Sequence, residues 1–98
     1  MKLSEFPKSK SMQQCPCCDY FSLAERGKSL VCPVCFWEDD CEDPSNPQWE
    51  SPSDLNDEYT LKVARKNFQK HGAWREKFSA VVVSEEERRT LKYVQRNV

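Results

Sequence analysis

Glycine and histidine are both scarce in this chain, which has two glycines and one histidine among its 98 residues. So few glycines leave no glycine-rich loop of the kind that cradles nucleotide phosphates. The single histidine, His71, leaves no Ser/His/Asp or Cys/His set that spacing could support, and we interpret it as a side chain that suits the end of a helix rather than as a ligand. Carboxylates cluster at 38–43, but nothing indicates a cleft that would shift their pKa values. We therefore expect a protein that is not an enzyme and has no small-molecule substrate.

Long apolar runs are also missing. Charged residues interrupt the first ten positions, so no secretory signal peptide is expected there. No stretch approaches the roughly 18 apolar residues of a membrane-spanning helix, and the mean hydropathy is −0.84. We therefore expect a cytoplasmic protein that does not contact a membrane. Because 98 residues suffice for only one core, residues 1–98 are expected to form a single domain.

Cysteine, in contrast, is abundant: six occur, at positions 15, 17, 18, 32, 35 and 41. In a reducing cytoplasm, clustered cysteines bind metal more often than they form disulfides, which are the alternative. Two pairs lie three positions apart, Cys15 with Cys18 and Cys32 with Cys35, and proline follows the first cysteine of each pair. Because proline fixes the dihedral that begins a tight turn, each pair can direct two thiolates at one ion. The spacing therefore predicts one structural zinc ion held by four sulfurs, with iron as the alternative metal.

Two cysteines remain, Cys17 and Cys41. We expect Cys17 to be an exposed residue of its turn, because it could replace a neighbouring ligand only by distorting that turn. Cys41 lies six residues after Cys35, too far for the same turn, and is interpreted as a small half-buried residue. A redox pair between the two is the alternative. Asp19 follows the first turn, where glycine is frequent, and aspartate tolerates a left-handed backbone better than most residues.

The hydrophobic pattern around these cysteines predicts a hairpin and then a helix. The hairpin has a strand at 20–23, a turn at 25–28 and a second strand at 30–31 that enters the second cysteine pair. Prolines at 44, 47 and 52 then resist regular structure. A helix is predicted over about 60–72, between an N-cap at its first residue and a C-cap at its last. Its apolar side consists of Leu61, Ala64 and Phe68.

The C-terminal part is predicted to contain a short strand and a second helix. Residues 80–83 are an apolar run typical of a strand. Ser84 and the glutamates after it form a capping box that opens a helix to about Gln95, with Leu91 and Val94 facing inward. The predicted fold class is small α+β, with three parts. These are a zinc-ribbon hairpin with two CxxC knuckles and an acidic extension (13–43), a Pro-rich acidic loop (44–59) and a basic helical part (60–98).

The formal net charge of −1 hides a separation of charge along the chain. Residues 29–60 carry nine acidic and no basic side chains, whereas residues 61–98 carry ten basic and four acidic ones. Carboxylates together with aromatic residues suit a surface that binds a basic partner protein. Solvated surface is the other interpretation, and the run lacks the spacing of a calcium loop. The candidate partner surface consists of Trp37, Glu38, Asp39, Asp40, Glu42, Asp43 and Trp49.

Two further hypotheses remain open. Nucleic-acid binding would use the basic side chains of the C-terminal part, but the pI of about 5.8 weighs against it. A redox or electron-transfer protein would use iron at the four sulfurs, or the pair of Cys17 and Cys41. The basic side chains in question are Lys62, Arg65, Lys66, Lys70, Arg75 and Lys77.

The motifs of this chain resemble those of a known family. The segments CPCCDY (15–20) and CPVCFWEDD (32–40) are similar to those of the cysteine-rich CPCC family of small bacterial proteins. Three later residue pairs and a glycine are also similar to positions of that family, namely Thr60-Leu61, Ala64-Arg65, Asn67-Phe68 and Gly72. The resemblance covers about residues 13–73 and departs at Asp19, where the family more often has glycine. It implies a zinc-ribbon-like fold and, because some members occur beside toxin genes, an immunity-type inhibitor of a bacterial toxin. It names no catalytic residue.

Overall fold

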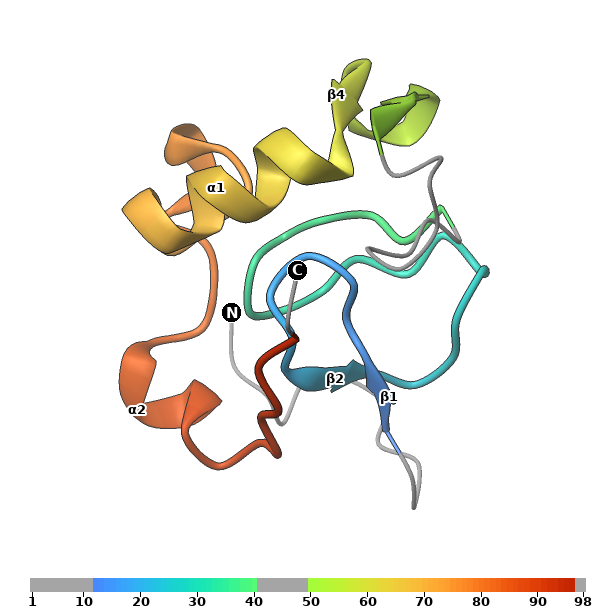
Figure 1. The fold of residues 1–98 in the computed structure, drawn as a ribbon. Coiled ribbons are helices and arrows are strands. Elements are labelled where there is room, and N and C mark those ends of the chain that lie inside the picture. The colour runs from blue at the N-terminus through green and yellow to red at the C-terminus, as the bar shows by residue number, and fades with distance from the viewer. Residues whose placement is uncertain (1–11, 41–49, 97–98) are drawn as a thin grey trace.

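The computed structural model describes residues 12–40 and 50–96. Its elements are short, and α1 and the β1–β2 pair lie on opposite sides of the loops that carry the cysteines (Figure 1). Each strand pair is antiparallel, β1 with β2 and β3 with β4. The fold is therefore small α+β, as predicted. In chain order the elements are β1 (Gln13–Gln14), β2 (Phe21–Leu23), β3 (Pro52–Ser53), the 3-10 turn η3 (Asp54–Asn56), β4 (Tyr59–Thr60), α1 (Leu61–His71), the 3-10 turn η4 (Glu76–Phe78) and α2 (Glu85–Arg88).

The first CxxC turn (15–18), called the first knuckle below, joins β1 to β2. The backbone N–H of Cys15 donates to the carbonyl of Tyr20 at 2.8 Å, and that of Asp19 donates to the carbonyl of Cys15 at 3.1 Å. Asp19 has a φ of 69°, the left-handed conformation expected for it. The hairpin prediction was wrong about the partner strand: residues 21–23 pair with β1 and not with 30–31. The knuckle is itself the hairpin turn, because its own backbone hydrogen bonds bring the flanking residues together.

The second CxxC turn (32–35), the second knuckle, repeats this backbone pattern. The N–H of Cys32 donates to the carbonyl of Trp37 at 2.9 Å, and the N–H of Phe36 donates to the carbonyl of Cys32 at 2.8 Å. An antiparallel bridge joins Val31 to Glu38 on either side of the turn. Phe36 takes the position equivalent to Asp19 and has a φ of 72°. A left-handed phenylalanine is uncommon, and the sequence gives no sign of it.

Helix α1 has the ends that were predicted for it. At its beginning the hydroxyl of Thr60 accepts a hydrogen bond from the N–H of Val63 at 3.2 Å. At its end Gly72 has a φ of 78° and donates its N–H to the carbonyl of Phe68 at 2.8 Å. The apolar side faces the core, since two of its residues are fully buried, namely Leu61 and Ala64.

The strand predicted at 80–83 is wrong, because these residues form turns and bends. Val83 is nevertheless buried at 3% exposure, and its N–H donates to the carbonyl of Pro33 at 3.0 Å. A single backbone contact with the second knuckle therefore replaces strand pairing.

The second helix begins where expected but is much shorter. The Ser84 hydroxyl accepts a hydrogen bond from the N–H of Glu87 at 3.2 Å, and α2 ends at Arg88. The chain then runs beside β2, where Tyr93 bridges to Tyr20. This pairing competes with further helix, and it leaves Val94 50% exposed instead of facing inward.

Aromatic side chains connect the second knuckle to the segment after α1. The ring of Trp74 packs edge-on against Trp37, with centroids 5.3 Å apart, and against Tyr59 at 5.1 Å. The backbone N–H of Trp74 also donates to the carbonyl of Cys35 at 2.9 Å. The core is therefore built around the cysteines rather than around a separate apolar layer.

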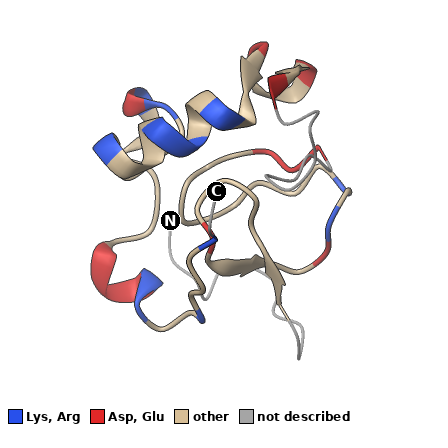
Figure 2. Ribbon diagram, in the orientation of Figure 1, with Lys and Arg blue, Asp and Glu red and all other residues tan. Residues whose placement is uncertain are grey.

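Charge is separated in space as well as in sequence. Lys and Arg residues mark α1, whereas Asp and Glu residues mark the region of β3, η3 and β4 (Figure 2). None of the helices among the described residues is long and apolar enough to cross a lipid bilayer.

Candidate metal centre

Both knuckles direct their cysteine side chains to one point inside the protein. The Sγ atoms of Cys15, Cys18, Cys32 and Cys35 all lie within 4.8 Å of one another. The separation is 3.6 Å between Cys15 and Cys35 and 3.7 Å between Cys18 and Cys32. Metal–sulfur bonds of about 2.3 Å in a tetrahedral site require sulfurs about 3.8 Å apart. The four cysteines selected by their spacing are therefore arranged so that they could hold a metal ion.

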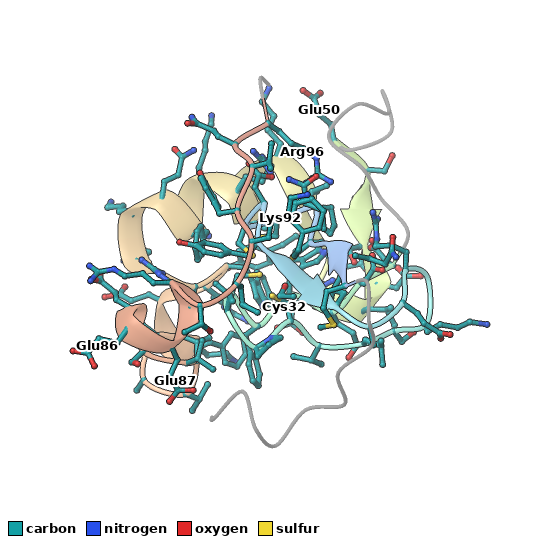
Figure 3. All side chains as sticks on the ribbon, turned by 90° about the horizontal axis from the view of Figure 1, so that it is seen from below. Cys32, Glu50, Glu86, Glu87, Lys92 and Arg96 are labelled. Carbon is teal, nitrogen blue, oxygen red and sulfur yellow. The ribbon has the colours of Figure 1, made fainter. Side chains whose placement is uncertain are left out.

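The sulfurs of this centre are enclosed by protein. Each of the four cysteines is at most 2% exposed, and the label of Cys32 stands among yellow sulfur atoms in the middle of the molecule (Figure 3). Four sulfur ligands complete a tetrahedron, so an ion held here would have no open position for a substrate. The geometry suits a structural ion rather than a catalytic one.

The environment shifts the pKa values of three of the thiols in different directions. Burial raises the pKa of Cys18 and of Cys35 well above the ordinary value, and most of their hydrogen bonds with neighbouring thiols act in the same direction. Burial also acts to raise the pKa of Cys32, but hydrogen bonds from the other thiols and from Ser22 hold it well below the ordinary value. Because burial opposes several thiolates close together, a bound cation is needed for all four to be deprotonated.

Ser22 is a polar neighbour of the centre that sequence analysis missed. Its hydroxyl lies 3.0 Å from the Sγ of Cys32, and the residue is only 5% exposed. The backbone N–H of Val34 donates to the same sulfur at 3.3 Å. A serine between Phe21 and Leu23 on a short strand is normally expected to face solvent, so the sequence carries no signal for this contact.

Cys17 does not have the exposure that was predicted. It is 2% exposed, because α1 covers the first knuckle and the guanidinium of Arg65 donates to the carbonyl of Cys17 at 3.4 Å. Burial raises the pKa of the Cys17 thiol. Cys17 is thus a neutral neighbour of the four sulfurs. Cys41 lies outside the described residues, so the redox pair of these two cysteines stays a prediction.

A buried group of charges ties the first knuckle to two distant segments. Arg65 of α1 donates to both carboxylate oxygens of Asp19, at 2.6 and 2.9 Å. The backbone N–H and the guanidinium of Arg96 also donate to this carboxylate, each at 2.9 Å. The same guanidinium groups donate to carbonyls of the knuckle, Arg65 to Pro16 and Arg96 to Cys15, both at 2.8 Å. We call Asp19, Arg65 and Arg96 the knuckle clamp.

The knuckle clamp explains why this chain has aspartate where its resemblance led us to expect glycine. Burial acts to raise the pKa of Asp19, but the hydrogen bonds from Arg65 and Arg96 hold it below the usual value. A glycine could take the same backbone conformation but would remove the carboxylate that Arg65 and Arg96 both contact. Arg65 is therefore not available for the nucleic-acid contact considered for it, since the residue is only 8% exposed.

The candidate partner surface needs correction at two of its residues. Trp37 is fully buried, because it packs against Trp74, and Asp39 is 1% exposed. The carboxylate of Asp39 accepts hydrogen bonds from the Nε of Arg26 at 2.9 Å and the N–H of Gly27 at 2.7 Å. This pair of contacts holds the 25–28 turn in place and is not available to a partner. Two members remain half-buried and accessible, Glu38 and Asp40. Three members lie outside the described residues, namely Glu42, Asp43 and Trp49.

Several of the basic side chains considered for nucleic acid already have partners within the chain. Lys62 contacts Glu50 at 2.8 Å. Arg75 forms an ion pair with Asp57 and stacks over the ring of Tyr59 at 5.0 Å. With Arg65 in the knuckle clamp, the cationic surface is smaller than the sequence suggested.

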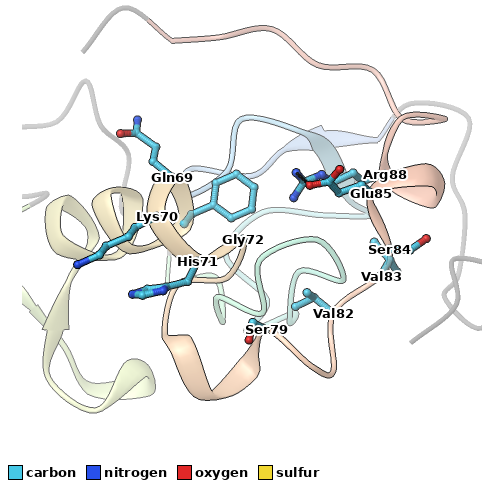
Figure 4. Close-up of a pocket in the computed structure, with 11 residues that line it drawn as sticks. Gln69, Lys70, His71, Gly72, Ser79, Val82, Val83, Ser84, Glu85 and Arg88 are labelled. Atoms are coloured by element: carbon cyan, nitrogen blue, oxygen red, sulfur yellow. Dashed lines mark ion pairs between the residues drawn. The ribbon is translucent and has the colours of Figure 1, made fainter.

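A polar cavity lies away from the cysteines, at the C-terminal end of α1. Its volume is about 440 Å³, and Figure 4 shows Lys70 and His71 on one side of it and Glu85 and Arg88 on the other. Side chains of both charges line it, and nothing in their arrangement selects a ligand of one sign.

The fold and the four-sulfur centre together define a small cysteine-rich protein with two knuckles. The family model described as "Cysteine-rich CPCC" matches residues 13–89, from the start of β1 to the residue after α2. The chain therefore belongs to the cysteine-rich CPCC family, which confirms the resemblance. Neither a curated protein nor a solved structure matches it.

Proposed function

We propose that this chain is a small protein with one structural zinc ion, and that its activity is the binding of another protein rather than catalysis. The observation that carries the proposal is the closed group of four buried sulfurs within 4.8 Å of one another. Soft thiolate ligands favour zinc over hard cations such as magnesium or calcium. A single iron ion would also fit four thiolates and would make the chain an electron carrier.

The metal part of the proposal can be tested directly. We expect one zinc per purified chain and no visible absorption, because only an iron–thiolate centre would colour the protein. Removal of the ion by a strong chelator should expose Trp37 and Trp74, since the second knuckle supports both, and so shift tryptophan fluorescence to longer wavelength. A coloured protein, or a metal-free chain with unchanged fluorescence, would contradict structural zinc.

The acidic surface of this chain supports the proposal that its partner is a protein with a basic surface. Acidic side chains around η3 and β4 are exposed, for example Asp54 and Glu58, and the nearby Glu50 and Asp57 are exposed although they pair with Lys62 and Arg75. Such a surface speeds association with a basic protein and orients it. Family resemblance sharpens the proposal to an immunity-type inhibitor, in which these carboxylates cover a basic active site of a bacterial toxin.

The partner class is tested with the zinc-loaded chain as bait in extract from its own cells, with and without nuclease. Captured proteins are identified by mass spectrometry, and the complex is rebuilt from purified components to measure its dissociation constant. We expect a basic protein whose capture resists nuclease. Recovery of nucleic acid alone, with binding that weakens steeply as salt increases, would favour the second hypothesis instead.

A further inference from the structure

Beside the second knuckle lies a groove that the metal centre does not use. Its volume is about 220 Å³, and it is lined by five apolar residues, an asparagine and two carboxylates. Sites for drug-sized ligands have volumes of about 300–1,000 Å³, so this groove suits a single side chain. We call it the aromatic groove, and its apolar residues are Val31, Phe36, Leu55, Trp74 and Phe78.

The rings of the aromatic groove form a continuous stack. The Phe36 and Phe78 centroids lie 4.7 Å apart, and those of Trp74 and Phe78 lie 5.7 Å apart. Phe36 has the left-handed backbone of the residue that follows each knuckle, with a φ of 72° against 69° at Asp19, and its ring packs on Phe78.

Glu38 lines the groove, and its backbone is held in place. The backbone of Glu38 is held by Asn56, whose Oδ1 accepts its N–H at 3.0 Å and whose Nδ2 donates to its carbonyl at 2.8 Å. The other rim carboxylate, Asp57, is paired with Arg75. Within the part of the chain that the structure describes, the carboxylate of Glu38 has no hydrogen-bond or ion-pair partner.

The same aromatic cluster already holds cations of this chain. The guanidinium of Arg75 lies 6.0 Å from the Trp74 ring, and the ammonium of Lys77 lies 5.1 Å from the Phe78 ring. Such contacts are attractive because the face of an aromatic ring is electron-rich. Glu38 and the groove thus combine the two features that bind a cationic side chain, a ring face and an unpaired carboxylate.

We propose that the aromatic groove binds an arginine side chain of the basic partner, an inference that rests on the proposed function. A guanidinium is planar, so it can stack on Phe36 or Phe78 while it donates to the carboxylate of Glu38. A lysine ammonium is more strongly hydrated and gains less from such a flat site. The groove therefore selects arginine among the side chains of a basic surface.

The test uses the intact zinc-loaded chain labelled with ¹⁵N and the capped tripeptide acetyl-Gly-Arg-Gly-amide. We expect saturable chemical-shift changes at the indole N–H of Trp74 and the amide of Glu38. The citrulline peptide, which has nearly the same shape without the charge, should bind about fivefold more weakly or worse. The lysine peptide should also bind more weakly than the arginine peptide.

Two variants remove one carboxylate each and serve as a matched pair. Glu38→Gln should weaken binding of the arginine peptide about fivefold, whereas Glu86→Gln, on the exposed face of α2, should leave it unchanged. Retained zinc and an unchanged spectrum away from the groove show that each variant is folded. Absence of saturable shifts at Trp74 and Glu38, equal binding by Glu38→Gln, or equal binding of the lysine peptide would overturn the inference. If a basic partner protein binds the Glu38→Gln variant with full affinity, the arginine site in the aromatic groove is contradicted. The proposed function, binding of a basic protein, is not affected by that result.

Discussion

The guanidinium of Arg65 donates two hydrogen bonds to the two carboxylate oxygens of Asp19, at 2.6 and 2.9 Å, although the residues are 46 positions apart in the sequence. The pair is buried, and the same arginine reaches the carbonyl of Pro16 at 2.8 Å. Helix α1 is thereby attached to the backbone of a metal-binding turn and not only to apolar side chains. The orientation of the first knuckle should depend on this contact.

Replacement of Asp19 by asparagine should destabilise the zinc-loaded protein by about 3 kcal/mol, because it leaves the buried guanidinium of Arg65 without the carboxylate that it pairs with. Unfolding by urea, followed by tryptophan fluorescence, measures this. The Asp19→Gly variant has no strain from a left-handed backbone at this position, but it also has no carboxylate. We therefore expect it to be less stable than the original chain as well. If Asp19→Gly proves as stable as the original chain, backbone strain rather than the ion pair governs this position.

The pH dependence of this contribution has a defined direction. The hydrogen bonds from the arginines hold the folded pKa of Asp19 below its ordinary value of 3.8, although burial acts the other way. A group with a lowered folded pKa contributes fully above its unfolded pKa, and its contribution is lost as pH falls through the folded value. The difference in unfolding free energy between the original chain and Asp19→Asn should therefore stay constant from about pH 8 to pH 5. A difference that shrinks within this range would mean that burial raises the pKa after all.

Cys35→Ser should abolish stoichiometric zinc binding and greatly reduce the yield of folded protein, because it removes one of the four sulfurs. Cys17→Ser changes a neutral neighbour in the same centre and should keep one zinc per chain. Cys41→Ser should also keep it. Metal analysis of the three purified variants measures this, and equal tolerance of all three changes would contradict the four-sulfur assignment.

Ser22→Ala should lower zinc affinity about tenfold, because the hydroxyl stabilises the thiolate of Cys32 from 3.0 Å. Competition with a chromophoric chelator gives the affinity. Ser79→Ala, at an exposed position, is the matched control. Equal affinities for both variants would show that the hydroxyl does not support the metal.

Asn56→Ala should cost about 2 kcal/mol of stability, because the backbone N–H and carbonyl of Glu38 lose their side-chain partner. The same variant should weaken binding of the arginine peptide, since the rim of the aromatic groove is no longer fixed. Urea unfolding and the peptide titration measure the two effects. If the Asn56→Ala variant keeps both its stability and its affinity for the peptide, the β3–β4 segment is held mainly by other contacts.

The features that could be predicted from the sequence are those that short stretches of sequence determine. The ends of α1 depend on Thr60 and Gly72, which act on backbone groups within four positions, and both were found as expected. The convergence of four sulfurs follows from the spacing of two knuckles. The left-handed backbone at Asp19 fits the sequence, because aspartate tolerates this conformation better than most residues.

What could not be predicted depends on contacts between distant segments. Arg65 looks like one of several surface cations on a helix until Asp19 is placed beside it. The acidic run after the second knuckle looks uniformly solvated, yet Asp39 caps a turn that begins at position 25. The helix predicted to reach Gln95 stops early because Tyr93 bridges to Tyr20, the residue before β2. In each case a tertiary contact outweighs the local pattern.

The knuckle clamp also sets an order of assembly. All four sulfurs lie within the first 35 residues, whereas Asp19 and Arg96 are 77 positions apart. During synthesis the metal centre can close as soon as the second knuckle emerges, but the carboxylate of Asp19 is fully paired only after Arg96 has been added. An ion captured early would therefore act as the nucleus on which α1 and then the C-terminal segment settle. Of the three residues of the knuckle clamp, Arg96 is therefore the last to be synthesised.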